Sequence, residues 1–527
     1  MALIGYVSDE RYLAVNDAAV ELEGPGGSFQ LRSGANGAVR GDVPAGRYRA
    51  TLAARGYGPK RTEVEVGGSP HHFRLMSERL LGYVWPKWVR SGEPGEWRVH
   101  SPEGYRLSLW RYGREAEEVA LLGWWDEHGP RATVQITPDG DYTQGGVGWN
   151  RIGYANPAYR PTIPAPERSG LYYFHAETDS GTSFTFPWVV APARPTARIA
   201  VLASTNTWNA YNNFGGRSNY INAAGLPEVP VVVARQEMAR YLDGSFSEHS
   251  QPDAAYPPLS FERPEWDNQM VIGERPTDPI RGRVRCALAP TEWRFLSWME
   301  GQGLEYDLYS EAQLDDGTLD LDSYGALVLN CHPEYWSRVM MSRVSSWVEE
   351  RGGHLLYLGG NGLDCEVEFL EGDRLHFLTE DPAPDGRHDS RMHRSNASPA
   401  SLLGVTFTYA GAMTGAPYRA LEPDHWVLGG TGLVAGQEFG RAGLQERCHG
   451  GASGHETDKT NANTPPGTVI LARGLNRDDG GAEMVIRDTP SGGAVFSVGS
   501  ITWVASILVD DAVSRITRNV LDRFLAG

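Results

Sequence analysis

Cysteine is scarce in this sequence. The chain has 527 residues, and its four cysteines are far apart, with no C-x-x-C pair among them: Cys286, Cys331, Cys365 and Cys448. This spacing weighs against both a disulfide framework and a zinc ribbon. Small buried thiols in a reduced compartment are the simpler expectation, so we predict a cytoplasmic protein with cysteines in its core.

Basic charge and long apolar runs are also lacking. Lys and Arg number 48 against 66 Asp and Glu, a formal charge of -18, which disfavours binding to nucleic acid or to an anionic membrane. No apolar run approaches the ~20 residues that cross a bilayer. The first residues, Met1-Ala-Leu-Ile-Gly-Tyr-Val7, have neither the basic start nor the longer apolar core of a signal peptide. We therefore expect neither a nucleic acid nor a membrane as partner.

Glycine, proline and aromatic residues are plentiful. The 63 Gly and 34 Pro suggest many turns, and 16 Trp with 23 Tyr suggest a folded, aromatic-rich protein. A chain of this length exceeds one hydrophobic core. The patterns divide it into three predicted domains, residues 1–77, 78–196 and 197–527.

The first two domains have the short alternating segments of β-sandwiches. Residues 19–23, Ala-Val-Glu-Leu-Glu, alternate between turns such as Asn36-Gly37. The run from Gly37 to Tyr57 resembles the transthyretin-like domain that accompanies many carboxypeptidases. Strand-like segments such as 96–100 and 171–175 predict a second, Ig-like sandwich over 78–196.

From residue 197 the strand-like segments alternate with helical ones. Residues 199–203, 305–309, 326–330, 354–358 and 494–498 are apolar, and helices are expected over 291–302, 337–351 and 510–525. In the second helix, Val339, Met340, Val344 and Trp347 form the expected buried stripe. The alternation predicts an α/β doubly wound parallel sheet, and its order resembles class I glutamine-amidotransferase-like domains. Residues 366–490 are expected to be a loop-rich elaboration.

One loop combines aromatic, polar and glycine residues to an unusual degree. Residues 204–220, Ser-Thr-Asn-Thr-Trp-Asn-Ala-Tyr-Asn-Asn-Phe-Gly-Gly-Arg-Ser-Asn-Tyr, follow the predicted strand 199–203, and we call them the tyrosine loop. Ligands of open α/β sheets bind at the carboxyl ends of the strands. The loop therefore places Tyr211 and Tyr220 where a ligand is expected.

Three further loops contain groups that could act with these tyrosines. They are Asn330-Cys-His-Pro-Glu-Tyr-Trp336, Leu358-Gly-Gly-Asn-Gly362 and Gly450-Gly-Ala-Ser-Gly-His-Glu-Thr-Asp458. Phenols and a carboxylate are hard oxygen donors, but a phenol with an ordinary pKa of about 10 needs a strongly stabilising cation to ionise at neutral pH. Iron(III) suits such donors, whereas calcium or magnesium would be expected to recruit more carboxylates. Packing alone also accounts for aromatic loops, so spacing leaves this choice open.

Taken together, these motifs resemble the large subunit of N,N-dimethylformamidase. The match runs over about 197–527, in family order, and ends with the segment Gly492-Gly-Ala-Val-Phe-Ser-Val-Gly-Ser-Ile501. The resemblance implies a mononuclear Fe(III) held by two tyrosines and a glutamate, and hydrolysis of the C–N bond of a small amide. A small amide substrate and further copies of the chain are the partners we expect.

Each implied role falls on a residue of this sequence. The metal ligands would be Tyr211, Tyr220 and Glu334; the catalytic residues would be His332 as proton carrier, Glu456 as acid and base, and Asn361 as hydrogen-bond donor to the oxyanion. The family has a long insertion between its two tyrosines that is missing here, so Tyr241 is the alternative second ligand.

The implied mechanism is Lewis-acid hydrolysis with general acid–base help. Trp208, Phe214 and Trp336 are expected to form an apolar wall for the substrate, and the arginine-rich run 387–394 is expected to be a solvated loop. The alternative function is a scaffold, without catalysis, that binds carbohydrate or protein through its sandwiches.

Overall fold

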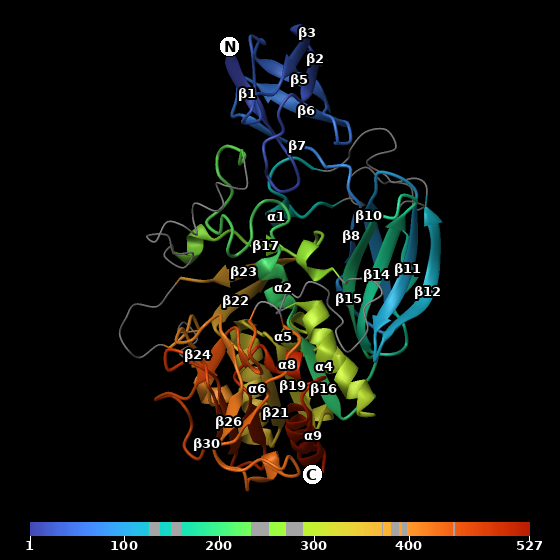
Figure 1. The fold of residues 1–527 in the computed structure, drawn as a ribbon. Coiled ribbons are helices and arrows are strands. Elements are labelled where there is room, and N and C mark those ends of the chain that lie inside the picture. Colours follow the sequence, from blue (N-terminus) through green and yellow to red (C-terminus); the bar gives the residue numbers. More distant parts are fainter. Residues whose placement is uncertain are drawn as a thin grey trace.

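The computed structural model describes residues 1–125, 138–148, 161–232, 252–269, 288–371, 373–380, 389–392, 398–445 and 448–526. The chain is β-rich and has several sheets, with the N-terminus at one end of the molecule and the C-terminus at the other (Figure 1). The prediction of a β-rich, multidomain protein is thus confirmed. In the described part of the chain, helices are too short or too polar to cross a membrane.

The N-terminal sheets face each other across one apolar core, which includes Val20, Tyr48 and Phe73. Their strands, in spatial order, are β4 (Ala38–Gly41), β1 (Ala2–Ser8) and β7 (His71–Arg74) in one sheet, and β3 (Gly27–Arg32), β2 (Ala19–Gly24), β5 (Gly46–Ala53) and β6 (Lys60–Val66) in the other. This arrangement is consistent with the predicted β-sandwich; its transthyretin-like character stays a prediction.

A second pair of sheets encloses a core rich in aromatic residues, which includes Trp97, Phe174 and Trp188. One sheet contains β13 (Thr162–Pro164), β10 (Pro94–His100) and β8 (Leu81–Trp85); the other contains β12 (Ala116–Trp125), β11 (Tyr105–Tyr112), β14 (Gly170–Thr178), β15 (Ser183–Ala191) and β9 (Trp88–Arg90). The pair is consistent with a second sandwich, and its Ig-like character remains a prediction.

Among the described residues, the largest sheet has nine strands, of which the first five are parallel. Their spatial order is β18 (Asp307–Ser310), β16 (Ile199–Ala203), β19 (Ala326–Cys331), β21 (His354–Gly359), β32 (Ala494–Ser497), β31 (Glu483–Asp488), β30 (Val469–Gly474), β26 (Tyr418–Ala420) and β27 (Glu438–Phe439). Counted along the chain, the parallel strands have the doubly wound order 2-1-3-4-5, which reverses between β16 and β19.

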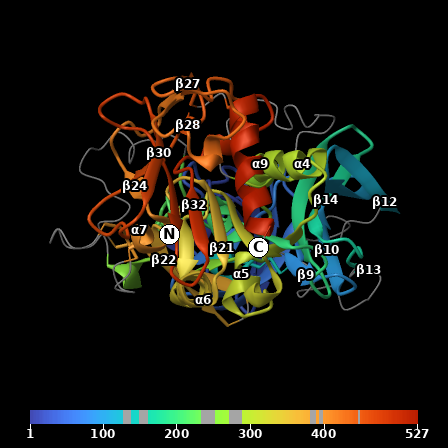
Figure 2. The ribbon, with the colours of Figure 1, turned by 90° about the horizontal axis from the view of Figure 1, so that it is seen from below.

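Helices cover both faces of this sheet because its parallel strands are apolar on both sides. Figure 2 shows α4 (Ala289–Gly301) and α9 (Asp511–Leu525) on one side, and α5 (Glu311–Asp315) and α6 (Arg338–Arg351) on the other. Helix α6 begins after Ser337, whose side chain accepts a hydrogen bond from the backbone of Met340. Val339 was predicted to belong to its buried stripe, but it is 46% exposed, because the helix turns that side to solvent.

The segment 366–490 was predicted to be a loop-rich elaboration, and this is only partly right. Its strands β26, β27, β30 and β31 are hydrogen-bonded onto the edge of the main sheet. A separate four-stranded sheet contains β17 (Leu259–Ser260), β23 (Arg374–Leu378), β22 (Cys365–Leu370) and β20 (Tyr335–Ser337). The likeness to glutamine-amidotransferase domains stays a prediction.

Candidate active site

The candidate site lies at the carboxyl edge of the parallel sheet, where the strand order reverses. Strand β16 leads into α2 (Thr205–Tyr211), which ends on Tyr211. Strand β19 ends at Cys331, directly before His332 and Glu334. These strands are neighbours, so the topology brings their two loops together at the point where doubly wound folds bind ligands.

Hydrogen bonds fasten α2 to the segment after β19. The Thr207 hydroxyl donates to the His332 carbonyl at 2.7 Å and accepts from the Glu334 N–H at 3.2 Å. The Asn206 amide donates to the Tyr335 carbonyl at 2.9 Å. Polar side chains in this short helix therefore set the position of Tyr211 relative to Glu334.

Both phenols of the tyrosine loop donate to one carboxylate. The Tyr211 hydroxyl lies 3.0 Å from Glu334 Oε2, and the Tyr220 hydroxyl lies 3.0 Å from Oε1 and 3.1 Å from Oε2. Their rings meet edge to face, with centroids 4.9 Å apart. The structure thus brings together Tyr211, Tyr220 and Glu334, which were predicted to be metal ligands.

His332 connects this cluster to Glu456. Its Nε2 lies 2.8 Å from the Tyr211 hydroxyl, 3.1 Å from Glu334 Oε2 and 3.5 Å from Glu456 Oε2. Its Nδ1 lies 2.8 Å from the Gly360 carbonyl, which can only accept, so Nδ1 carries a proton. The ring is therefore oriented with Nε2 toward the two carboxylates.

The turn after β21 brings Asn361 to Glu456. A Cβ on Gly360 would lie 2.3 Å from the Glu456 carbonyl, so only glycine lets the two backbones approach this closely. The Asn361 amide donates to Glu456 Oε2 at 3.2 Å, and its backbone N–H donates to Asp458 Oδ1 at 2.8 Å. Asp458 also accepts from the Tyr357 hydroxyl at 2.8 Å, which fixes the turn to strand β21.

Arg391 is part of the site, although the run 387–394 was predicted to be a solvated loop. Its Nη2 donates to Glu334 Oε1 at 3.1 Å, and its guanidinium also pairs with Asp364. Arg391 is 7% exposed because these two carboxylates compensate its buried charge. Nothing in the sequence pattern distinguished this arginine from its neighbours, of which 387–388 and 393–394 lie outside the described residues.

Tyr335 is a third phenol that sequence reasoning left without a role. Its hydroxyl lies 2.5 Å from that of Tyr220 and accepts from the Asn219 amide at 3.1 Å. Since Tyr220 donates to Glu334, the Tyr335 hydroxyl is the donor to Tyr220. The only feature of the sequence that could have indicated a role for Tyr335 is its position next to Glu334 in the 330–336 motif.

Burial and charge shift the protonation of these groups in different directions. Burial alone would lower the pKa of His332, but the hydrogen bond to Glu334 and the charge of Glu456 raise it to about 9. Burial raises the pKa of Glu456, with only partial opposition from the charge of His332. Burial, followed by the charge of Glu334, raises the pKa values of Tyr211 and Tyr220 well above their usual value. Both phenols are therefore protonated in the structure as described.

Four described residues at this edge have a left-handed backbone without being glycine. They are Cys331, Asn361, Leu363 and His455, with φ angles of 63°, 48°, 58° and 64°. Such conformations are costly and concentrate at ligand sites. Each directly precedes or carries a group of the cluster. Cys331 is fully buried, as predicted.

The donor set fits a hard, highly charged cation. Within the described ranges, no group of three or more His, Cys, Asp or Glu side chains is placed to hold a metal, so a metal here would depend on the phenols. The hydroxyl oxygens of Tyr211 and Tyr220 each lie 3.0 Å from an oxygen of Glu334. The buried carboxylates of Glu334 and Asp364, with the partly exposed one of Glu456, give the site an acidic balance; a trivalent ion would favour the phenolates.

The predicted apolar wall for the substrate is not found, and the alternative ligand Tyr241 is not among the described residues. Trp208, Phe214 and Trp336 do not form one wall, because they belong to three different hydrophobic cores. Trp208 and Trp336 instead donate their indole N–H groups to buried carboxylates. Tyr241, the alternative second ligand, falls outside the described residues.

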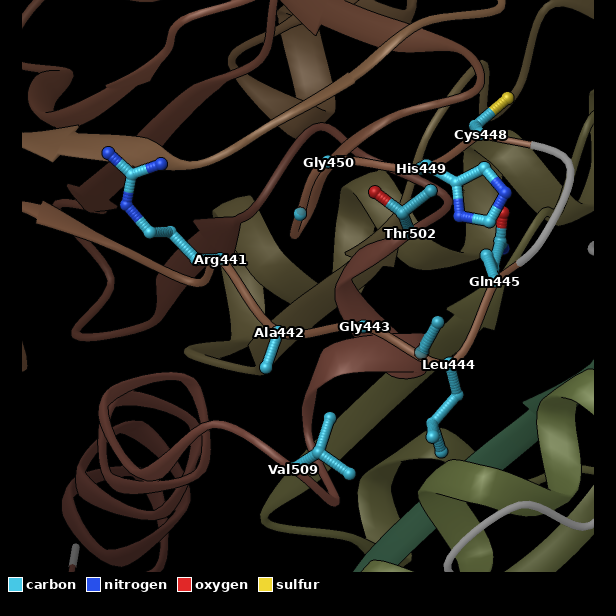
Figure 3. Close-up of a pocket in the computed structure, with 12 residues that line it drawn as sticks. Arg441, Ala442, Gly443, Leu444, Gln445, Cys448, His449, Gly450, Thr502 and Val509 are labelled. Atoms are coloured by element: carbon cyan, nitrogen blue, oxygen red, sulfur yellow. The ribbon is translucent and has the colours of Figure 1, made fainter.

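A cavity of about 420 Å³ lies beside the loop that contains Glu456 (Figure 3). Cys448, His449 and Gly450 line one part of it, and Thr502 and Val509 line another. None of its described lining residues belongs to the cluster around Glu334. The first half of the 450–458 loop therefore borders this cavity, while its second half reaches the cluster.

The comparisons assign the chain to a family. It belongs to the N,N-dimethylformamidase beta subunit-like, C-terminal family, whose profile matches residues 103–514. Among relatives, it is 25% identical over 417 residues to the N,N-dimethylformamidase beta subunit of Paracoccus aminophilus. It is 24% identical over 424 residues to the protein of the same name from Alcaligenes sp.

These relatives are longer than the matched region. Each match covers 69% of this chain but only 53% of the relative. Among solved structures, the fibronectin(III)-like modules of Clostridium thermocellum CbhA match 37% of this chain and 93% of their own, at 10% identity and a TM-score of 0.13. A likeness of that size carries no argument about fold or function.

Proposed function

We propose that this protein is an iron-dependent amidohydrolase that cleaves the C–N bond of a small amide, including N-substituted ones. The observation that carries the proposal is the convergence of two phenols, His332 and Arg391 on Glu334, with Glu456 one contact further away. The names of the family and of its relatives give the reaction class. Family membership alone, at about a quarter identity, leaves the substrate open.

Tyr211, Tyr220 and Glu334 would hold a mononuclear iron(III). Bound there, the ion would supply Lewis acidity at the sheet edge. The phenols must lose their protons to become ligands, and their raised pKa values mean that only a strong cation can drive this. Arg391 is held by Asp364 and steadies the carboxylate of Glu334.

Glu456 is the proposed general base and acid. Its pKa is raised above the ordinary glutamate value and so lies closer to neutral pH. A general base is most efficient when its pKa is near the operating pH. Glu456 Oε2 takes a proton as the water oxygen bonds to the amide carbon, and it gives the proton to the nitrogen as the C–N bond breaks. A carboxylic acid and an amine result.

His332 and Asn361 orient this exchange. His332 holds its Nε2 between Glu334 and Glu456; with a pKa of about 9 the ring is protonated at neutral pH, so Nε2–H can donate toward the Glu456 carboxylate. Asn361 donates to Glu456, while its Oδ1 is buried and has no hydrogen-bond partner within the described chain. A substrate N–H could therefore donate to Oδ1, and the second amide hydrogen of Asn361 could donate to the oxyanion.

Purified protein is expected to contain close to one iron per chain and to show a tyrosinate-to-iron absorption band in the visible. In Tyr211→Phe a ligand oxygen is missing, so both iron and band should fall sharply. Mass spectrometry for metal and a visible spectrum of the same sample measure this, and an amide substrate screen follows. Colourless, iron-free protein that cannot be reconstituted would contradict the proposal and favour a scaffold without catalysis.

Tyr335→Phe should weaken iron binding without abolishing it. The Tyr335 hydroxyl donates to Tyr220, and a hydrogen bond to a charged oxygen contributes about 1.5–3 kcal/mol, or ~10–100-fold in affinity. Removing it raises the energy of the phenolate electrons, so the visible band should move to longer wavelength. Titration with iron and the band position test this. An unchanged band in iron-loaded Tyr335→Phe would show that Tyr220 is not a ligand.

A further inference from the structure

We infer that the N-terminal sandwich, residues 1–76, is a positioning element of the tyrosine site. Its Arg74 and the segment 9–12 hold the turn Gly215–Gly216, which lies between Tyr211 and Tyr220. The family profile begins at residue 103, so this part of the chain lies outside it. The consequence for metal binding rests on the proposed function; the docking itself does not.

Both backbone groups of Gly215 are bonded to the sandwich. Its N–H donates to the Glu10 carbonyl at 2.7 Å, and its carbonyl accepts from Arg74 Nη2 at 3.2 Å. Arg74 also donates to the carbonyls of Asp9 at 3.0 Å and Gly140 at 2.8 Å. Its guanidinium is fully buried, so these carbonyls replace water as its partners.

Gly216 fits a surface that no larger residue can meet. Its φ is +97°, and a Cβ there would lie 2.4 Å from Tyr12 Cβ and 2.8 Å from the Arg11 carbonyl. The close approach and the left-handed backbone both require glycine. The tyrosine loop is thus fitted against the segment after β1.

The chain after Tyr220 docks on the same segment. Val231 pairs in parallel with Leu13, with its N–H donating to the Tyr12 carbonyl at 3.0 Å. The Tyr12 hydroxyl donates to the Pro227 carbonyl at 3.0 Å. Tyr220 therefore lies between two points of attachment to the N-terminal sandwich.

The second sandwich holds the opposite side of the same turn. Phe214 is buried in the core of that sandwich, stacked on Tyr142 of the short helix α1 (Tyr142–Gly145). The Arg74 guanidinium lies 4.0 Å from the centroid of the same ring, so Tyr142 links the two sandwiches, and Figure 1 shows β7 next to α1. Tyr211 is fixed by α2, whereas the position of Tyr220 depends on this docked turn.

The test compares Gly216→Ala with Gly225→Ala in the full-length chain. Both glycines have positive φ, +97° and +118°, but a Cβ on Gly225 would meet only Pro257 Cγ, at 3.9 Å. Both variants strain the backbone, and only the first breaks the docking. Iron affinity should fall about 10–100-fold in Gly216→Ala, which is the usual loss when a group that supports a metal ligand is removed. It should stay near the wild-type value in Gly225→Ala.

Hydrogen exchange of the metal-free proteins provides the second readout. Peptides covering 212–222 should exchange faster in Gly216→Ala than in Gly225→Ala or wild type. Arg74→Gln, which leaves every glycine in place, should also show faster exchange over 212–222. It replaces Gly216→Ala as the test variant if Gly216→Ala does not fold. Arg49→Gln on the exposed face of the same sandwich is its control.

The outcomes separate the two proposals. Faster exchange with weaker iron binding supports the inference. Native exchange and full iron in both Gly216→Ala and Arg74→Gln would overturn it. If wild type binds no iron but the exchange difference appears, the proposed iron function fails and the docking of the loop stands.

Discussion

Glu456→Gln is expected to keep its iron and lose about 10²–10⁴-fold in kcat, the usual contribution of a positioned acid or base. Glutamine has nearly the same shape but cannot take a proton from water. The iron ligands Tyr211, Tyr220 and Glu334 are untouched, so iron content and the visible band should match wild type. Steady-state rates with a turned-over amide, together with metal analysis, check this. Activity within tenfold of wild type at full iron would remove Glu456 from the mechanism.

The pH profile of the wild-type enzyme tests the same residue. The folded-state pKa of Glu456 is raised above the ordinary glutamate value of 4.5. The base must be ionised to act, so activity should be lost as the pH falls through this raised value. The acid limb of kcat/KM therefore lies above pH 4.5 and should be missing from the residual activity of Glu456→Gln.

The sequence predicted the parallel-sheet elements well because their apolar runs are unambiguous. The run 199–203 forms β16 with the predicted bounds, and 354–358 differs from β21 by one residue. Helix 337–351 was also found, yet one member of its stripe, Val339, is exposed. Periodicity indicates which face of a helix is apolar, but the width of the buried stripe depends on the neighbouring elements.

The candidate site could be predicted only where each residue lies in its own motif. Tyr211 ends the helix that follows β16, and His332 and Glu334 follow the neighbouring strand β19, so the topology brings these segments to one edge of the sheet. Arg391 reaches Glu334 from 57 residues further along the chain, and its partner Asp364 lies 27 residues before it. Contacts of this kind arise from tertiary packing, and nothing local separates Arg391 from the other arginines of the run 387–394.

The same limit explains the role of the N-terminal sandwich. The sequence motifs placed no candidate site residue in residues 1–76, and the resemblance there was only to a domain that accompanies many carboxypeptidases. In the structure, Glu10 and Arg74 of the sandwich hydrogen-bond to Gly215 and hold the turn of the tyrosine loop. Two of these three contact groups are backbone atoms, for which a sequence offers no direct signal.

Glu334→Gln is expected to reduce iron affinity more than 100-fold. Loss of a group that only supports a metal ligand costs about 10–100-fold, and this variant removes a charged ligand itself. Both phenols donate to this carboxylate, and an amide nitrogen would point a donor at one of them. One unit of negative charge next to a trivalent ion is lost as well. Iron content after dialysis against a chelator, with the visible band, measures the effect.

Glu366→Gln is the matched control for this variant. Glu366 is also a buried carboxylate, 2% exposed, and it accepts from Arg338 at 3.0 Å as Glu334 does from Arg391 at 3.1 Å. It should retain iron, because no phenol of the tyrosine loop donates to it in the described structure. In Glu334→Gln, Arg391 keeps Asp364 as its partner, so the metal-free chain should still fold. Equal iron in both variants would mean that the phenols and Glu334 form only a hydrogen-bonded cluster, and the ligand assignment would be wrong.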